Sequence, residues 1–175
     1  TGERLGFVDV GEGCHIAGSV ALADGRAYYG HYGNGFACID LETGKVVWEH
    51  THPQHPFFSS PAIGADRVIF GGRDKAVHCV RRDTGEELWS FKTRRKVDAS
   101  PVLAHGKVVF GSGDGWLYVL DASDGRELWS YEVGRSIFSS PAVAAGTIVV
   151  GSNDGRLYAF GAPRPPAGEK SETAR

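Results

Sequence analysis

Short apolar runs separated by glycine, aspartate and proline recur along the chain. One run covers residues 67–71 (Arg-Val-Ile-Phe-Gly), and similar runs occupy 26–30, 107–111 and 147–151. They are apolar at almost every position, which is typical of strands covered on both faces. No segment places its apolar residues at helical spacing. The pattern therefore predicts an all-β chain.

The runs belong to a repeat that is marked by three tryptophans. Trp48, Trp89 and Trp129 stand 41 and 40 residues apart, and each closes a run that follows a Thr-Gly or Asp-Gly turn. A period near 40 with several strands per unit is the signature of a β-propeller. The turn glycines are Gly44, Gly85 and Gly125.

Each unit is expected to contain four antiparallel strands. The first starts at a Ser-Pro pair in three units, and residues 19–22 are the same element without its proline. Proline belongs at a strand start or on an edge such as the one lining a propeller channel. The Asp-Gly pair at 114–115 favours a tight primed turn between the second and third strands. The first strands are expected at 19–22, 60–63, 100–103 and 140–143, the third at 35–39, 76–80, 116–120 and 156–160, and the fourth at 45–49, 86–91 and 126–133.

Counting strands leaves two architectures open. Residues 3–10 are predicted to form a lone fourth strand, followed by three complete units and by a last unit of three strands. These roughly four blade equivalents are either an open arc of a larger ring or a ring closed by pairing residues 3–10 with the last blade. Residues 1–161 thus form the repeats, and the proline-containing residues 162–175 are predicted to be a flexible tail. The chain lacks methionine and starts inside a repeat, so we expect it to be the C-terminal part of something longer.

Residues 38–48 (Cys-Ile-Asp-Leu-Glu-Thr-Gly-Lys-Val-Val-Trp) closely resemble the tryptophan-docking motif of pyrroloquinoline-quinone (PQQ) repeat propellers, Ala-x-Asp-x-x-Thr-Gly-x-x-x-Trp. Residues 119–129 fit nearly as well, whereas the second copy departs at Arg81 and the first has Gly6 in place of tryptophan. The resemblance covers residues 1–161. It implies that each tryptophan ring is inserted between neighbouring blades, against a turn glycine and the small residue that opens the motif.

The resemblance implies two functional classes. PQQ-dependent dehydrogenases are periplasmic enzymes that hold quinone and calcium beside an adjacent Cys-Cys disulfide, whereas non-enzymatic relatives are protein-binding scaffolds, one of which assists outer-membrane β-barrel assembly. The cysteines here, Cys14, Cys38 and Cys79, are far apart in sequence. We therefore expect a non-enzymatic scaffold without a cofactor in an extracytoplasmic bacterial setting. A fragment of a PQQ- and calcium-dependent alcohol or sugar dehydrogenase is the alternative.

One loop face is the predicted binding surface. In the usual blade order, connections from a fourth strand to the next first strand share a face with the turns between second and third strands. Clustered cations on this face would suit a protein or an acidic ligand, or would form a solvated rim without one. The formal charge of −2 argues against nucleic acid, and the longest apolar runs are too short to span a membrane. The predicted cations are Arg73, Arg94, Arg95, Lys96 and Arg135. The rest of its own propeller is a further expected partner.

Metal binding is a second functional alternative. The same face would gather a thiol and several imidazoles, which are ligands for zinc or copper, whereas the simpler interpretation is a solvated polar loop. These candidates are Cys14, His15, His31, His52 and His55. Cys38 and Cys79 occupy one repeat position and are expected to be buried thiols. His50, His78 and His105 are expected to be packing or surface residues, and Asp74, Asp114 and Asp154 to be turn formers.

Overall fold

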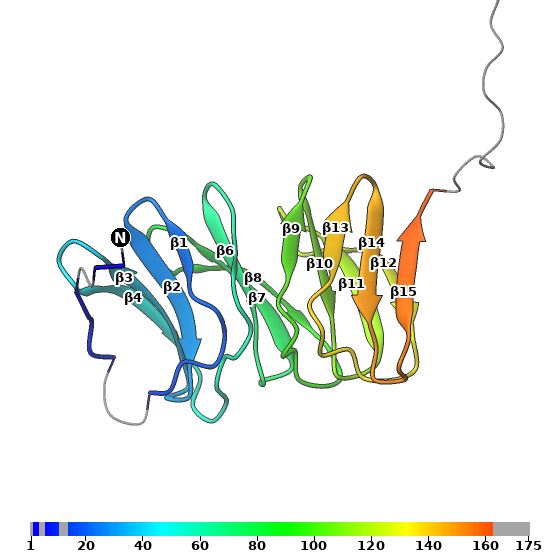
Figure 1. Cartoon of the computed structure of the whole chain (residues 1–175), viewed down its shortest axis with the longest axis horizontal. Helices are drawn as coiled ribbons and strands as arrows, with labels where there is room; N and C mark the ends of the chain where they lie inside the picture. Colours follow the sequence, from blue (N-terminus) through cyan, green and yellow to red (C-terminus); the bar gives the residue numbers. More distant parts are fainter. Residues whose placement is uncertain (1, 4–5, 11–13, 163–175) are drawn as a thin grey trace, which may run out of the picture.

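The chain forms a row of four antiparallel sheets (Figure 1). The computed structural model describes residues 2–3, 6–10 and 14–162. Within these residues all regular structure is β, and no helix is long and apolar enough to cross a membrane.

Blade 1 contains β1 (Ala21–Ala23), β2 (Arg26–His31), β3 (Gly35–Asp40) and β4 (Val46–Thr51). Blade 2 contains β5 (Ala62–Ile63), β6 (Arg67–Gly71), β7 (Ala76–Arg81) and β8 (Glu87–Lys92). Blade 3 contains β9 (Val102–Ala104), β10 (Lys107–Gly111), β11 (Trp116–Asp121) and β12 (Glu127–Glu132), and blade 4 contains β13 (Ala142–Ala144), β14 (Thr147–Gly151) and β15 (Leu157–Gly161).

The topology confirms the predicted all-β propeller architecture. Strands within each sheet follow sequence order, so every blade is an antiparallel meander. The short first strands contact one another from blade to blade, in the order β1, β5, β9 and β13. The apolar second and third strands are buried between neighbouring sheets, as in β6 and β7. The row does not close into a ring.

The predicted strand at residues 3–10 is not formed. Its described part has no strand, and residues 4–5 lie outside the described residues. Val8 and Val10 instead pack against Tyr29, Ala37 and Ile39 of blade 1. The segment thereby covers the nearest apolar sheet face, while β15 lies at the opposite end of the row (Figure 1). Closure by pairing residues 3–10 with the last blade was therefore wrong, and the chain forms an open arc.

A tryptophan ring lies in each of the first two seams between blades. The Trp48 ring packs on Gly85, where an added Cβ would lie 2.7 Å from the ring, and Trp89 packs in the same way on Gly125. Both glycines have φ of +74°, a backbone conformation in which a residue with a side chain would be strained. The Trp89 Nε1–H donates to the carbonyl of Ala122 at 3.1 Å, and the Trp48 Nε1–H makes the equivalent bond to Arg82 at 3.0 Å.

The third tryptophan differs from the arrangement that the resemblance implies. Trp129 is 39% exposed and meets Phe160 edge-on, with ring centroids 5.2 Å apart. The residues after Phe160 lack the Thr-Gly turn that would receive the ring. At the other end of the row, Gly44 faces Val8 because Gly6 stands where a tryptophan would be.

Serine side chains connect the beginnings of successive blades. The backbone N–H of Ser60 donates to Ser100 Oγ at 2.9 Å, and the same bond recurs from Ser19 to Ser60 and from Ser100 to Ser140. The first strands therefore begin two residues after these serines, later than predicted, since the N–H of Ser19, Ser60 and Ser100 bonds the next blade. In blades 2 to 4 the residue after the serine is a proline, which has no N–H to donate. The turn at 114–115 is not primed, because positive φ occurs at Gly115 and not at Asp114.

Candidate functional site

The predicted loop face is braced by one repeated backbone hydrogen bond. A residue of each turn between second and third strands donates its N–H to the preceding connection between blades. Because this bond recurs in every blade, the connections are held in similar positions around the arc. The bonds are Tyr32 N–H to His15 O (2.9 Å), Arg73 N–H to Pro56 O (3.2 Å), Gly113 N–H to Lys96 O (3.0 Å) and Asn153 N–H to Ser136 O (3.0 Å).

Two of the five predicted cations are engaged in structural contacts. Arg73 donates to both carboxylate oxygens of Asp98, at 3.0 and 3.1 Å, and Lys96 Nζ lies 2.6 Å from the same carboxylate. Arg73 also lies over the Phe58 ring, 4.1 Å from its centroid, and Lys96 lies 5.0 Å from the centroid of Phe138. These two cations therefore connect neighbouring blades and are partly neutralised.

The other three cations are exposed and unpaired. Within the described part of the chain, the guanidinium groups of Arg94, Arg95 and Arg135 have no carboxylate partner, although their backbone is anchored. The carbonyls of Arg95 and Arg135 accept hydrogen bonds from equivalent serines, Ser112 and Ser152. Positive charge is therefore presented from a braced backbone.

Exposed aromatic side chains accompany these arginines, and sequence reasoning missed two of them, Phe58 and Phe138. Tyr32 is 51% exposed and contacts Phe58 with ring centroids 4.3 Å apart, while Phe138 is 39% exposed. Phe58 and Phe138 occupy the repeat position that Asp98 holds between them, which is the signal that could have found them. We call the set the rim surface: Tyr32, Phe58, Arg94, Arg95, Arg135 and Phe138.

The predicted metal ligands on the loops do not converge. His31 is buried and engaged, with Nε2 3.0 Å from Glu49 Oε1 and Nδ1 accepting the N–H of Gly33. His52 Nδ1 accepts backbone N–H groups, including that of His55. Among the described residues, the loop candidates bring no three ligand atoms together. The remaining two candidates are Cys14, which is partly buried, and His15, which is exposed beside Tyr32.

A different cluster lies in the seam between blades 1 and 2. His50 on β4, His78 on β7 and Glu87 on β8 bring three ligand atoms within 4.8 Å of one another. His78 is only 6% exposed, and its ring lies between Asp74 (Nε2 to Oδ2, 2.9 Å) and Glu87 (Nδ1 to Oε2, 3.0 Å). The sequence signal was available, because the repeat positions of His50 and His78 carry Phe91 and Tyr118 in the next copy. We call His50, His78, Glu87 and Asp74 the seam cluster.

The two histidines of the seam cluster have opposite pKa shifts. Burial disfavours the charged form of His78, but the hydrogen bonds and charges of Asp74 and then Glu87 outweigh it and raise the His78 pKa. Burial and the neighbouring His78 lower the pKa of His50. Burial would raise the pKa of Asp74, but its hydrogen bond to His78 prevails and lowers it. Protonation is thus favoured at His78 and disfavoured at His50.

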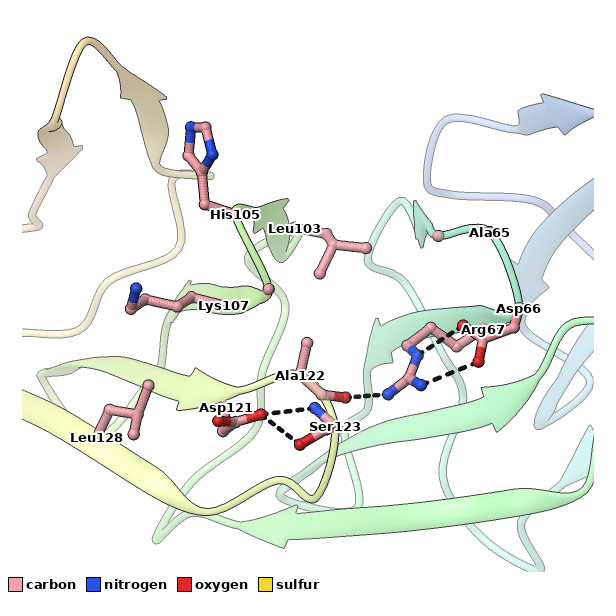
Figure 2. Close-up of a pocket in the computed structure, with 12 residues that line it drawn as sticks. Ala65, Asp66, Arg67, Leu103, His105, Lys107, Asp121, Ala122, Ser123 and Leu128 are labelled. Carbon is pink, nitrogen blue, oxygen red and sulfur yellow. Dashed lines mark hydrogen bonds and ion pairs between the residues drawn. The ribbon is translucent and has the colours of Figure 1, made fainter.

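A groove on the opposite face belongs to blade docking. It runs between blades 2 and 3, and Figure 2 shows the Arg67 guanidinium on one wall reaching Asp66 and the carbonyl of Ala122. The same carbonyl receives the Trp89 Nε1–H. Its principal hydrogen-bonding groups therefore already hold the seam together.

Comparisons with known proteins place this architecture in a family. A family model described as "Outer membrane protein assembly factor BamB" matches residues 1–78 and 73–163. The chain belongs to this family of PQQ-like repeat propellers. Its repeats are 37% identical to quinoprotein ethanol dehydrogenase from Pseudomonas putida over 68 residues, which are 39% of this chain and 11% of the relative. They are 29% identical to outer membrane protein assembly factor BamB from Xanthomonas campestris pv. campestris over 89 residues, 46% of this chain and 22% of that protein.

The solved structure of BamB from Moraxella catarrhalis is similar to this PQQ-like propeller. The TM-score is 0.73 at 25% identity, and the match covers 83% of this chain and 46% of that one. The chain thus spans less than a quarter of either curated relative's length and about half of this solved one. The relatives of this chain thus include both a dehydrogenase and assembly factors.

In the described residues of this family member, the groups that the resemblance associates with a quinone site have other surroundings. Cys38 and Cys79 are fully buried on different blades, so they form no adjacent pair. Among the recurring turn carboxylates, Asp114 accepts the Tyr118 hydroxyl at 3.1 Å, and Asp154 accepts the Tyr158 hydroxyl. Both carboxylates are therefore occupied within their own blades.

Proposed function

We propose that this chain is a non-enzymatic, protein-binding part of a PQQ-like propeller outside the cytoplasm, and that its rim surface binds an acidic segment of a partner protein. The observation that carries the proposal is the set of three exposed guanidinium groups that, among the described residues, have no carboxylate partner on a braced loop face. Similarity to BamB, whose name describes outer membrane protein assembly, supports a binding role and an extracytoplasmic location.

The chemistry of the rim surface suits a carboxylate-rich partner. Guanidinium groups bind carboxylates in pairs of hydrogen bonds, and arginine and tyrosine are enriched among residues that dominate binding energy at interfaces. Because the backbone bonds already order the connections, binding loses less conformational entropy there. The exposed rings of Tyr32 and Phe138 would cover apolar side chains of the same segment.

The test is a fluorescence anisotropy titration with a labelled glutamate-rich peptide that contains one phenylalanine. We expect the variant R94Q/R95Q/R135Q to bind about tenfold more weakly or worse, since three charge-assisted contacts are lost. A charge-matched control, K45Q/K107Q/R126Q, removes three exposed cations from the opposite face and should bind like the wild type. Equal losses in both variants, or no binding by the wild type, would contradict the proposal.

A dehydrogenase fragment is the second candidate, and the 37% identity to quinoprotein ethanol dehydrogenase favours it. The assay adds PQQ, calcium and an artificial electron acceptor to the chain, with ethanol or glucose as substrate. The scaffold proposal predicts no substrate-dependent dye reduction. Dye reduction that requires both PQQ and substrate would contradict the scaffold proposal and show that the chain is an enzyme.

A further inference from the structure

The seam between blades 1 and 2 carries a polar version of an otherwise aromatic arrangement. In the next seam, Phe91 and Tyr118 lie with ring centroids 5.3 Å apart, and the Tyr118 hydroxyl donates to Asp114. In the first seam, His50 and His78 occupy the equivalent positions 5.0 Å apart, with Asp74 in place of Asp114. Two imidazoles thus replace two aromatic rings while the surrounding fold stays the same.

Each seam also contains a glutamate, and the two glutamates make different contacts. Glu87 and Glu127 occupy the same repeat position, but Glu127 accepts a hydrogen bond from Ser130 at 2.7 Å, whereas Glu87 also reaches an imidazole nitrogen at 3.0 Å. In the described part of the chain, His50 makes no hydrogen bond through its ring nitrogens, and its ring contacts are with Phe57, Phe70 and His78. A partly buried histidine without a polar partner is a group that a ligand could satisfy.

We propose that His50, His78 and Glu87 bind one zinc ion in this seam, with Asp74 as the positioning residue for His78. Two histidines and one glutamate are a known zinc ligand set, with water in the fourth position. Zinc–nitrogen and zinc–oxygen bonds of about 2.0–2.2 Å place neighbouring ligand atoms roughly 3.3 Å apart. The His78 and Glu87 ligand atoms, at 3.0 Å, are already near that spacing.

His50 is the ligand that must move. All three ligand atoms lie within 4.8 Å of one another, so closing the site to a spacing of roughly 3.3 Å requires a shift of up to about 1.5 Å by an imidazole that no hydrogen bond from the described residues restrains. The Glu87 side chain is 43% exposed, which leaves the ion a path from solvent. The 8% exposed side chain of His78 forms the closed side of the site.

Asp74 sets which nitrogen of His78 faces the ion. Its carboxylate accepts the Nε2–H at 2.9 Å, so His78 keeps that proton and would bind the ion through Nδ1, which faces Glu87. Zinc binding then replaces the proton on Nδ1, and this proton leaves to solvent. A carboxylate behind a metal-binding imidazole is a recurring arrangement in zinc sites.

The test is isothermal titration of the chelator-treated, metal-free chain with Zn²⁺, supported by the visible spectrum of the Co²⁺ form. We expect one equivalent of zinc, and a Co²⁺ spectrum without thiolate charge transfer because no cysteine belongs to the site. H50F/H78Y installs the residues of the second seam and should abolish stoichiometric binding while keeping the fold. E87Q removes a partly exposed ligand, and it decides the outcome if the double variant fails to fold.

Two further variants test the role of Asp74 and the participation of the loop ligands. D74N should weaken zinc binding by about 10–100-fold without changing its stoichiometry, because it loosens the orientation of His78. The control C14S/H52A/H55A removes loop ligands and should bind zinc like the wild type. The proposal is overturned if the wild type binds no stoichiometric zinc, if H50F/H78Y or E87Q binds as tightly as wild type, or if the loop control abolishes binding.

Discussion

At the scale of single residues, the neighbouring blade decides what each repeated side chain does. Trp48 and Trp89 share one motif position with Trp129, and the first two are buried because a turn glycine of the next blade receives each ring. Within the described residues, Trp129 has no such glycine against it and stays 39% exposed. The same motif residue is therefore expected to stabilise the first two seams more than the end of the arc.

The substitution Trp89→Ala is expected to lower the free energy of unfolding by about 3–5 kcal/mol, because it opens a cavity in a packed seam and removes the bond to the carbonyl of Ala122. Trp129→Ala should cost clearly less, since its ring is already partly hydrated. Urea unfolding of both variants followed by circular dichroism measures the difference. Equal losses of unfolding free energy in the two variants would show that the contribution of each ring does not depend on its exposure.

Thiol reactivity should also follow burial. Burial raises the pKa of Cys79 to about 12, and it raises the pKa of Cys38 as well, so neither forms an appreciable thiolate at pH 8. With Ellman's reagent at that pH, we expect one rapidly reacting thiol, Cys14, and three thiols after denaturation in urea. The C14S variant should show no rapid phase in the folded state. More than one rapid thiol in the wild type would contradict the packing of the seams.

At the scale of strands and seams, local pattern predicted most elements closely. The run at 67–71 is β6 with the predicted bounds, and β7 extends the predicted 76–80 by one residue. Residues 3–10 misled the prediction because their apolar pattern suits a strand, whereas the structure uses Val8 and Val10 only to cover blade 1. Periodicity reports which side chains become buried, but not whether the backbone finds a pairing edge.

The comparison of the two seams predicts that a second zinc site can be introduced by substitution. Phe91→His combined with Tyr118→His would copy the histidine pair into the second seam, where Glu127 and Asp114 already occupy the equivalent acidic positions. The variant is expected to bind two zinc ions per chain instead of one, as measured by titration calorimetry. Phe91→Leu with Tyr118→Phe is the matched control and should keep one. A stoichiometry of one in the histidine variant would mean that these four positions are not sufficient.

At the scale of the whole molecule, the open arc has unequal ends. Val8 and Val10 cover the outer face of blade 1. At the other end, β15 is bonded to β14 on one side only within the described residues, and Leu157 on it is 79% exposed. An unpaired strand with exposed apolar side chains favours association with another chain.

This asymmetry predicts concentration-dependent self-association through blade 4. Leu157→Lys should reduce the association measured by analytical ultracentrifugation without lowering the melting temperature, because the side chain is already in solvent. Leu41→Lys, at a 50% exposed turn position of blade 1, is the control and should associate like the wild type. An unchanged profile for Leu157→Lys would place the association elsewhere.

The amino-acid sequence by itself determined the repeat, the strands and the first two tryptophan seams, because strand pattern, turn glycines and motif spacing are local properties. Only the tertiary structure decided which charged and polar groups remain available to bind a partner or a ligand. Asp98, 25 residues from Arg73, pairs with both that arginine and Lys96, whereas Arg94, Arg95 and Arg135 stay unpaired within the described part of the chain. His50 and His78 meet only because two blades pack face to face. Side-chain partners across a seam depend on the rotation and spacing of whole sheets, which no local pattern encodes.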